Sequence, residues 1–430
     1  MLLNILRTYK LLKQIIKFNL NKKKINRKRI HSDQMTFIKK YSVKLFLFIF
    51  TAATLISCEN NPNSTGITFI SPDDTLSTRV LDSQIDSMTI TNNNYLLYIN
   101  TSSSENILVG NYQNYTSKAL LKFINIDPNL DSATIVSAIL TLKYNDYSFN
   151  NKSGLTSMNV FDMNTSFDYS TVLYDSVSSS NYGTVSKGSY SGTPTADTQK
   201  VNITLNNQMV KDWLEYTADT SYPVKNYGMI LLPNASSTTI SGFYSFNNTT
   251  DLIPYITVIY TKNSVLDTAN LNISEYVTLS DAPSSIIPVN RFVLQSGVAY
   301  RNVLNFDLSK LPYNVIINNV NLQFTLDSKS SVISSSTDKR VVLGMVVDSV
   351  NHTDSIFVDA FQSDSVTYIL SSTALNAIFQ RWNSGVTPYL GLSMKNYYET
   401  QNMDHFVFYS PSAAEVSFRP KLRITYTLRN

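Results

Sequence analysis

Histidine, cysteine and closely spaced carboxylates are the side chains that would carry catalysis or metal binding, and this chain of 430 residues contains few of them. Its three histidines, His31, His352 and His405, have no histidine or cysteine neighbour at the spacing of zinc ligands. No Gly-x-Ser-x-Gly elbow is present to expose a nucleophilic serine. Paired carboxylates for glycoside hydrolysis are defined by three-dimensional geometry, and four acids are predicted instead to be solvated surface groups: Glu215, Asp359, Asp404 and Glu415. The sequence therefore predicts a protein that is not an enzyme and that has no cofactor.

The segment DPNLD, from Asp127 to Asp131, is the best candidate for a metal site in the sequence. Carboxylate and loop carbonyl oxygens are the ligands that Ca²⁺ prefers, and Asp127 and Asp131 would supply two carboxylates. Asp, Asn and Pro are equally typical of a turn between two strands. We favour the turn and keep a Ca²⁺ site at these two residues as the alternative.

Tyrosine is the most abundant residue type with a ring that could contact a ligand, with 27 copies in the chain. An aromatic ring with a polar tip suits a wet binding surface. The candidates for stacking on a sugar ring lie in two pairs: Tyr112 with Tyr115, and Tyr397 with Tyr398. The alternative is that these tyrosines are half-buried strand residues, since aromatic residues are enriched in strands.

The only cysteine, Cys58, follows an apolar run from Leu45 to Ile56. As a helix this run of twelve residues would reach about 18 Å, which is well short of the roughly 30 Å hydrocarbon core of a bilayer. The run suits the apolar region of a signal peptide that starts at Met35 and has three lysines between residues 39 and 44. The sequence therefore predicts a signal peptide at residues 35–57.

The four residues Leu55-Ile56-Ser57-Cys58 resemble the lipobox of bacterial lipoproteins. The resemblance implies that the thiol of Cys58 is acylated and that the peptide is cut just before it. This sulfur would then be a membrane anchor, and a polar tether of residues 58–80 is expected to follow it. The alternative is a free or buried cysteine that happens to follow an apolar run.

Residues 1–34 carry ten Lys or Arg and a single acid, Asp33. A basic arm for nucleic acid or a membrane surface is one interpretation; we favour the other, that the chain starts at Met35, because a secretion signal normally begins a chain. Residues 1–57 hold 13 of the 35 basic and one of the 31 acidic residues, so the remainder has 22 basic and 30 acidic residues, a net charge near −8. A mildly acidic mature chain has no electrostatic footprint for nucleic acid, and we exclude that partner.

The pattern of the rest of the chain, which must position these side chains, is mainly β. β-branched and aromatic residues suit a pleated surface, and Asn, Ser and Asp supply turns. Alternating runs predict strands with one face on a core: 138–144, 253–260, 320–326 and 420–426. Helical periodicity is clearest in two short stretches, 208–216 and 373–382.

Segments in the second half of the chain match segments in the first half in the same order. Besides the two helices, the matched pairs are 119–126 with 302–309, 226–234 with 388–396, 242–246 with 407–411, and 253–263 with 419–430. Gly228 aligns with Gly391. At this point two stretches of backbone are expected to come so close together that a Cβ would not fit. The order of the matches predicts a duplicated domain, with one copy at 81–262 and the other at 263–430.

The predicted domains resemble the DNRLRE-type β-sandwich domains, which are grouped with carbohydrate-binding modules of bacterial surface proteins, and the layout is similar to that of tandem-domain lipoproteins of Bacteroidota. In the first copy the family's pattern is carried by Ala119, Leu121, Phe123, Ile126, Ala138, Leu140, Leu142, Tyr144, Trp213, Asn226-Tyr227-Gly228-Met229, Pro254, Ile256, Val258 and Tyr260. The second copy has Asn302 in place of the alanine and Pro388-Tyr389-Leu390-Gly391 in place of Asn-Tyr-Gly, and the charged motif that names the family is absent from both copies. The resemblance implies two tandem jelly-roll-like antiparallel β-sandwich domains, each with one short helix, after the N-terminal lipoprotein signal peptide.

We expect an exported lipoprotein, anchored to the outer membrane, that binds glycan or another cell-surface polymer without catalysis. The alternative is a structural or protein-interaction role in an envelope, secretion or gliding assembly. An exposed aromatic platform on a concave sheet would favour glycan, whereas a flat apolar patch or an uncovered edge strand would favour a protein partner. The sequence leaves open whether the protein faces the periplasm or the exterior.

Overall fold

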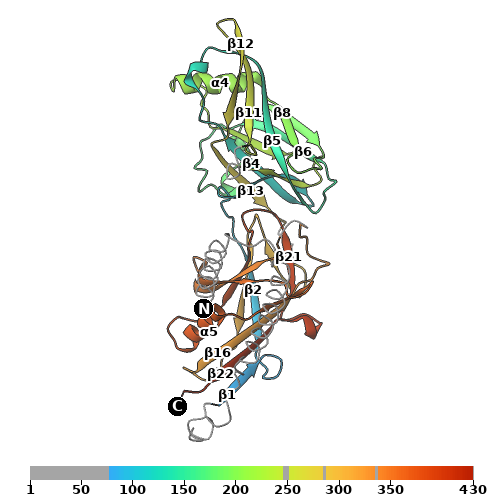
Figure 1. Cartoon of the computed structure of the whole chain (residues 1–430), viewed down its shortest axis with the longest axis vertical. Helices are drawn as coiled ribbons and strands as arrows, with labels where there is room; N and C mark the ends of the chain where they lie inside the picture. The colour runs from blue at the N-terminus through green and yellow to red at the C-terminus, as the bar shows by residue number, and fades with distance from the viewer. Residues whose placement is uncertain (1–76, 246–250, 284–286, 335–337, 430) are drawn as a thin grey trace, which may run out of the picture. The chain divides into compact units, whose positions relative to one another are not determined.

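The structure is a computed structural model of the whole chain, and it describes residues 77–245, 251–283, 287–334 and 338–429 (Figure 1). Strands make up 46% of the structure and helices 10%, so the predicted mainly β class with antiparallel sheets is confirmed. Residues 76–430 group into one compact unit. The basic segment 1–34, the signal peptide 35–57 with its lipobox, Cys58 and the tether up to residue 76 lie outside the described residues.

The first strand set holds the strands from β3 to β13. Its members are β3 (Asn106–Tyr112), β4 (Tyr115–Lys122), β5 (Thr134–Phe149), β6 (Thr156–Asp162), β7 (Gly188–Gly192), β8 (Lys200–Thr204), β9 (Met229–Pro233), β10 (Ile240–Tyr244), β11 (Tyr255–Lys262), β12 (Val265–Asn272) and β13 (Glu275–Asp281). They pair in the order β12-β11-β5-β10-β3-β4-β9-β6-β7, with β13 on β4 and β8 on β5. The long strand β5 pairs with β11 near its start and with β10 near its end, so the sheet curls over its own core.

The second strand set holds two strands from the start of the described chain and nine from its C-terminal part. Its members are β1 (Thr78–Asp82), β2 (Ile90–Leu96), β14 (Arg291–Gln295), β15 (Tyr300–Phe306), β16 (Ile316–Thr325), β17 (Val341–Asp348), β18 (Thr353–Ala360), β19 (Thr367–Leu370), β20 (Leu392–Asn396), β21 (His405–Tyr409) and β22 (Lys421–Thr427). One sheet has the order β1-β22-β16-β19, and the other has the order β18-β17-β20-β15-β14-β21 with β2 on β15.

Each strand set closes around its own buried apolar core. The core of the first set takes Leu140 and Ile256 from β5 and β11, and Leu121 and Leu231 from β4 and β9. The core of the second set is built in the same way from β16, β22, β15 and β20. Apolar and polar residues alternate along these strands, because successive side chains of a strand point to opposite faces of its sheet.

Among the residues that the structure describes, the α-helices are the ones that the periodicity predicted, α4 (Asn207–Ala218) and α5 (Thr373–Asn383). Each begins at a polar N-cap, since Asn206 accepts a hydrogen bond from the Met209 amide and Ser372 accepts one from the Leu375 amide. Each helix buries its tryptophan, Trp213 or Trp382, against the core of its strand set. Four 3₁₀ turns complete the elements: η2 (Pro128–Leu130), η3 (Tyr174–Ser176), η4 (Ser179–Asn181) and η5 (Val416–Phe418).

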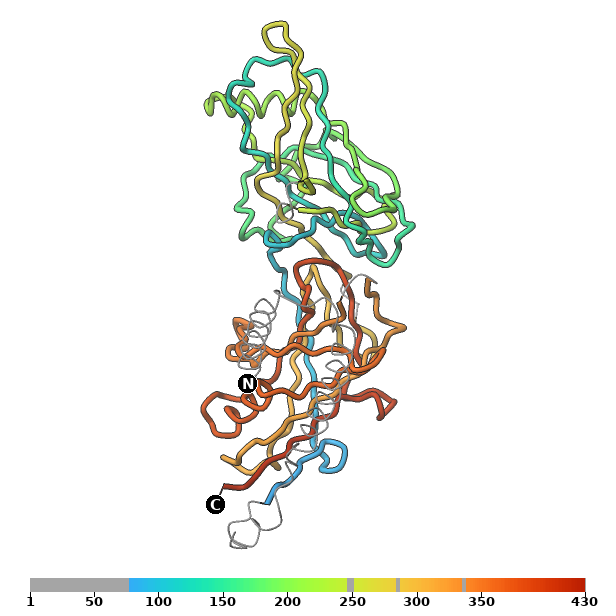
Figure 2. Tube along the Cα trace, in the orientation of Figure 1, coloured from blue at the N-terminus to red at the C-terminus, as the bar shows by residue number. Residues whose placement is uncertain are grey.

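Strand pairing departs from the predicted boundaries of 58–80, 81–262 and 263–430. Strand β1 begins inside the predicted tether and pairs with β22, while β2 pairs with β15. In Figure 2 these blue strands lie among the orange and red strands of the C-terminal part. Strands β12 and β13 follow residue 262 but pair with β11 and β4 of the first set. Strand pairing therefore does not follow these boundaries, because a strand can complete a sheet that lies far along the chain.

The matched glycines confirm the predicted close approach of backbones. Gly228 and Gly391 have φ values of +89° and +97°, in the region that favours glycine. A Cβ on Gly228 would lie 2.5 Å from the Leu121 carbonyl oxygen, and one on Gly391 would lie 3.0 Å from the Leu304 carbonyl oxygen. Both glycines therefore allow the chain to enter β9 or β20 directly beside β4 or β15.

Candidate functional site

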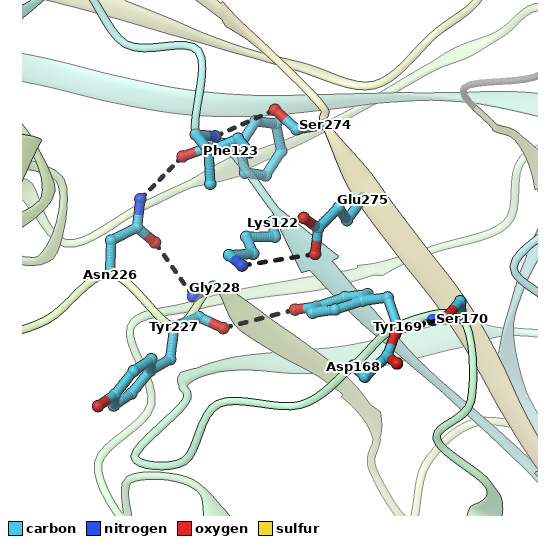
Figure 3. A network of polar contacts seen from close by, with 11 residues as sticks. Lys122, Phe123, Asp168, Tyr169, Ser170, Asn226, Tyr227, Gly228, Ser274 and Glu275 are labelled. Carbon is cyan, nitrogen blue, oxygen red and sulfur yellow. Dashed lines mark hydrogen bonds and ion pairs between the residues drawn. The ribbon is translucent and has the colours of Figure 1, made fainter.

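The first candidate site is a pocket of about 440 Å³ beside strands β4 and β13, which we call the Lys122 pocket. Its lining combines charged, hydroxyl and aromatic side chains: Ser102, Lys122, Phe167, Asp168, Tyr169, Ser170, Ser274, Glu275 and Tyr276. Figure 3 shows Lys122 and Glu275 pointing toward each other, with Tyr169 beside them. Polar groups that converge near aromatic rings are typical of a small-ligand site.

Residues 163–187, between β6 and β7, provide one wall of the Lys122 pocket and cover the outer side of the sheet. Their apolar side chains, Met163, Tyr169, Val172 and Val177, pack on Leu120, Ile230, Val277 and Leu279 of β4, β9 and β13. This cluster is separate from the core on the inner side of the same strands. The segment, which we call the covering segment, is therefore held in place by apolar burial.

Lys122 and Glu275 form a cross-strand ion pair in the Lys122 pocket, because they stand directly opposite each other on β4 and β13. Lys122 Nζ lies 3.4 Å from Glu275 Oε2, with the side chains 18% and 37% exposed. A pair this exposed contributes little to stability. The ammonium and the carboxylate keep further donors and acceptors for a ligand with several hydroxyl groups.

Tyr169 and Asp168 border the Lys122 pocket in defined protonation states. Burial raises the pKa of Tyr169 well above its usual value, and its hydroxyl donates to the Tyr227 carbonyl at 3.4 Å. Hydrogen bonds from the hydroxyl and the amide of Ser170 to Asp168 Oδ1 lower the pKa of that carboxyl. The tyrosine is therefore neutral and the aspartate ionised at neutral pH.

The side chain of Asn226, the first residue of the Asn-Tyr-Gly stretch, supports the same region (Figure 3). Asn226 Nδ2 donates to the Phe123 carbonyl at 2.8 Å, and Asn226 Oδ1 accepts from the Gly228 amide at 3.1 Å. Ser274 Oγ accepts from the Ile124 amide at 3.0 Å. Asn226 therefore ties the start of β9 to the end of β4, and Ser274 ties the start of β13 to the same place.

The second candidate site is the outer side of β2, β15, β20, β17 and β18 in the second strand set, which we call the Arg301 face. Register places Tyr95 opposite Arg301, and Lys395 opposite Val342. Arg301 makes a two-pronged ion pair with Glu399, with both N–O distances 2.7 Å. Burial alone would lower the pKa of Arg301, but its hydrogen bonds to Glu399 and the charge of that carboxylate raise it above its usual value.

Three rings on the Arg301 face each contact a second ring or a cation. Tyr95 stacks on His352 with 4.2 Å between centroids, Lys395 Nζ lies 5.2 Å from the Phe357 centroid, and Arg340 Cζ lies 3.6 Å from the Tyr397 centroid. Phe357 is 52% exposed and Tyr397 is 43% exposed. Burial raises the pKa of Asp354 on β18, a shift that its hydrogen bond to Ser393 opposes. The face therefore combines exposed rings with hydrogen-bonding groups.

The structure does not bring the four predicted stacking tyrosines together. Tyr115 is buried against Phe149, and burial raises its pKa to about 12. Tyr112 is half-buried, edge-on to Phe149, and its hydroxyl accepts a hydrogen bond from Asn150. Tyr397 stands on the Arg301 face, with Tyr398 edge-on beside it at 4.9 Å. Of the four, Tyr397 has the most open ring.

The two predicted calcium ligands have other partners. Asp127 caps the 3₁₀ turn η2 by accepting from the Asn129 amide at 2.9 Å, and Asp131 Oδ1 lies 2.8 Å from Lys262 Nζ. These contacts are those of a turn between strands, the interpretation favoured from the sequence. Within the described ranges, no group of three or more His, Cys, Asp or Glu side chains is placed to hold a metal ion.

Asp404 is a correction to the sequence analysis, which placed it among the solvated acids. Its side chain is fully buried, where Oδ1 accepts from the Tyr147 hydroxyl at 3.1 Å and Oδ2 accepts from the Ser334 amide at 3.2 Å. Glu215 is half-buried and accepts from the Ser132 amide, while Asp359 and Glu415 are exposed. A buried carboxylate needs hydrogen-bond partners, and those of Asp404 come from distant parts of the chain.

The charged residues of both candidate sites were not found from the sequence. Lys122 and Glu275 are separated by more than 150 positions, and Arg301 and Glu399 by almost 100. Lys122 lies within the matched segment 119–126 but is not one of its pattern residues. The signal that could have drawn attention to Lys122 and Arg301 is a cation within a strand of otherwise uncharged residues, although β4 also holds Lys118.

The strands define the class of the protein, an antiparallel β-sandwich protein. The comparisons with known proteins do not identify a family within this class. No family model matches the chain, and no curated protein matches it. The chain is similar to the crystal structure of the infectious bursal disease virus VP2 subviral particle at 10% identity, over 83% of this chain and 79% of that chain, with a TM-score of 0.12. A TM-score this low carries no argument about fold or function. In the part of the chain that the structure describes, no helix is long and apolar enough to span a bilayer.

Proposed function

We propose that the chain is an exported, outer-membrane lipoprotein whose strand sets are tandem copies of a jelly-roll-like β-sandwich module, and that it binds glycan or another cell-surface polymer without catalysis. The Arg301 face carries the proposal. It offers rings that are exposed, such as Phe357 and Tyr397, next to charged groups that donate and accept hydrogen bonds. An open sheet face admits the middle of a polymer, whereas the Lys122 pocket would suit a single sugar unit.

A glycan array with residues 76–430 tests the binding. Phe357→Ala and Tyr397→Ala should each weaken binding by about fivefold, because a lost ring contact is worth about 1 kcal/mol. Tyr313→Ala is the matched control, since Tyr313 is an exposed tyrosine of the second strand set that contacts Ser384. Equal binding by all variants would remove the Arg301 face from the proposal, and Lys122→Ala on the same array would then test the pocket.

The lipid anchor is tested by the mass of the N-terminal peptide from membrane-bound protein. We expect a peptide that begins at an acylated Cys58, and Cys58→Ser should move the protein to the soluble fraction. Ser57→Ala is the control, because it keeps a small residue before the cysteine. A mature product that retains residues 35–57 and an unmodified thiol would contradict the anchor.

One observation favours the alternative, a structural or protein-interaction role. Strand β12 is at the end of its sheet order, and its first residues, Val265 and Leu266, are exposed. An apolar edge strand is a site where another chain can add a strand. An array on which the unaltered protein binds no glycan would favour this alternative, and a photo-crosslinking residue at position 266 would then identify the partner.

A further inference from the structure

Residues 78–96 and 265–281 occupy matching places in the two strand sets. Strand β1 lies beside β22 as β12 lies beside β11, and β2 lies beside β15 as β13 lies beside β4. All four of these pairings are antiparallel. We call each strand pair, β1 with β2 and β12 with β13, a donor pair.

Each donor pair completes the strand set that does not follow it in the chain. The pair β1 and β2 precedes β3 but belongs to the second set, and the pair β12 and β13 precedes β14 but belongs to the first set. The connections that follow the two donor pairs, residues 97–105 and 282–290, are of equal length. The first set is therefore a continuous run of strands, β3 to β13, whereas the second set is completed by β1 and β2 from before that run.

The donor pairs are part of both cores. Leu81 and Met88 are buried in the second core, while Leu271, Ile273 and Tyr276 are buried in the first. Strand β2 pairs along its whole length with β15, and β13 does the same with β4. Without a donor pair, each set would expose apolar core residues and the unpaired edges of two strands.

The chain crosses between the sets at a polar contact. The Thr101 hydroxyl donates to the Thr278 carbonyl at 2.8 Å and accepts from the Thr278 amide at 2.9 Å. Thr101 lies in the connection after β2, and Thr278 lies in β13 of the other donor pair. Asn100 in the same connection donates to the Tyr169 and Val172 carbonyls, so the connection is anchored mainly on the first set.

We propose that residues 78–96 are exchangeable, and that a second copy of the chain can supply them to the second strand set, giving a strand-exchanged dimer. The second set already accepts β1 and β2 across the whole intervening run of β3 to β13, so it does not require these two strands to be adjacent in the chain to its other strands. Exchange between two copies keeps the pairing of β1 with β22 and of β2 with β15, and keeps Leu81 and Met88 buried, so a second copy is the partner that fits. Exchange of an identical element is a low-cost route to a dimer, and this inference is independent of glycan binding.

Cross-strand disulfides test the proposal in residues 76–430, which form one compact unit and contain no cysteine. Val80→Cys with Thr425→Cys places two thiols directly opposite each other on β1 and β22. Refolding at rising protein concentration should give a growing fraction of disulfide-linked dimer on a non-reducing gel. Thr257→Cys with Asn270→Cys, in the β11–β12 hairpin, is the matched control and should give monomer at every concentration.

Two results would overturn the proposal. The first is a Val80→Cys/Thr425→Cys protein that stays monomeric on the gel at every concentration. The second is a disulfide in Val80→Cys/Ile259→Cys, because that bond would mean that β1 folds back on β11 of its own repeat. Light scattering of the cysteine-free chain after the same refolding provides a readout that does not depend on disulfide formation, and monomer at all concentrations there would also overturn exchange between copies.

Discussion

The outer sides of the two strand sets use the same scaffold in opposite ways. In the first set, Leu120 stands between Ile230 and Val277, and all are buried beneath the covering segment 163–187. At the same register in the second set, Val303 stands between Ser393 and Asn93, and the turn that joins β17 to β18 is short. The outer side chains at this register are therefore apolar in the first set, where the covering segment lies over them, and largely polar in the second set, where no such segment lies among the described residues. The inner cores stay alike.

Lys118 on β4 and Arg301 on β15 are cations at matching positions of the two outer sides, and they pair with different parts of the chain. Lys118 Nζ donates to the Val177 carbonyl at 2.8 Å and lies 4.3 Å from the Tyr174 ring centroid, both in the covering segment. Burial lowers the pKa of Lys118. Arg301, at the matching position, pairs instead with Glu399, which follows β20. The cation of the second set therefore finds its partner at the end of a strand of its own sheet. No covering segment is needed to pair with it, and the outer side stays accessible.

The largest expected effect is on the Arg301–Glu399 pair. Arg301→Ala should lower the free energy of unfolding by about 3–5 kcal/mol, because it leaves a nearly buried carboxylate without its cation. Lys118→Ala in the first set should cost about 1 kcal/mol, since it leaves only a carbonyl without its donor. Urea unfolding measures both. Arg301→Met with Glu399→Met should recover most of the loss, and equal losses for Arg301→Ala and Lys118→Ala would contradict the difference between the two sides.

The second prediction exchanges matching residues of the two outer sides. Val277→Asn should lower the free energy of unfolding by about 3 kcal/mol, because it removes a buried apolar side chain and buries an amide beneath the covering segment. Asn93→Val, at the matching position on the Arg301 face, should change it by no more than about 0.5 kcal/mol, because Asn93 is exposed. Thermal or urea unfolding of the pair gives the answer, and a small effect of Val277→Asn would mean that the covering segment opens readily.

The third prediction concerns pH and position 405. His405 is buried in β21, and burial lowers its pKa to about 4. The unfolded chain binds this proton at an ordinary histidine pKa near 6.5, so stability should fall as pH drops from about 6.5 to about 4, by about 3 kcal/mol in total. His405→Ile copies Ile240, the residue at the matching place in β10, which is fully buried. The variant should lose this pH dependence, and an unchanged profile between pH 4 and 6.5 would show that other groups cause it.

The smallest expected effect is on the Lys122–Glu275 pair. Lys122→Ala or Glu275→Gln should change the free energy of unfolding by less than about 1 kcal/mol, because the pair is partly exposed and screened. Lys152→Ala is the control, since Lys152 forms an exposed ion pair with Asp146 at 2.9 Å. Urea unfolding at low and high salt measures the difference. A loss comparable with that of Arg301→Ala would mean that the pocket is closed to water.

Local patterns predicted the elements well, because they depend on periodicity within a few residues. The stretch 138–144 lies within β5, the stretch 208–216 lies within α4, and the stretch 420–426 begins one residue before β22. The matched glycines were also predicted, since a close backbone approach leaves a residue without a Cβ. The charged residues of the two candidate sites were not predicted, because residues such as Arg301 and Glu399 come together only through the sheet and its end.

By itself, the sequence determined the mainly β class, the two capped helices, and which face of each strand is apolar, because alternation and helix caps are local. Only the tertiary structure decided that β1 and β2 complete the second strand set, that Asp404 is buried, and that one outer side is covered and the other open. The physical reason is that backbone hydrogen-bonding groups are the same along every strand. The residues of a strand determine which of its faces is buried, but the strand that pairs with it depends on the packing of the whole sheet.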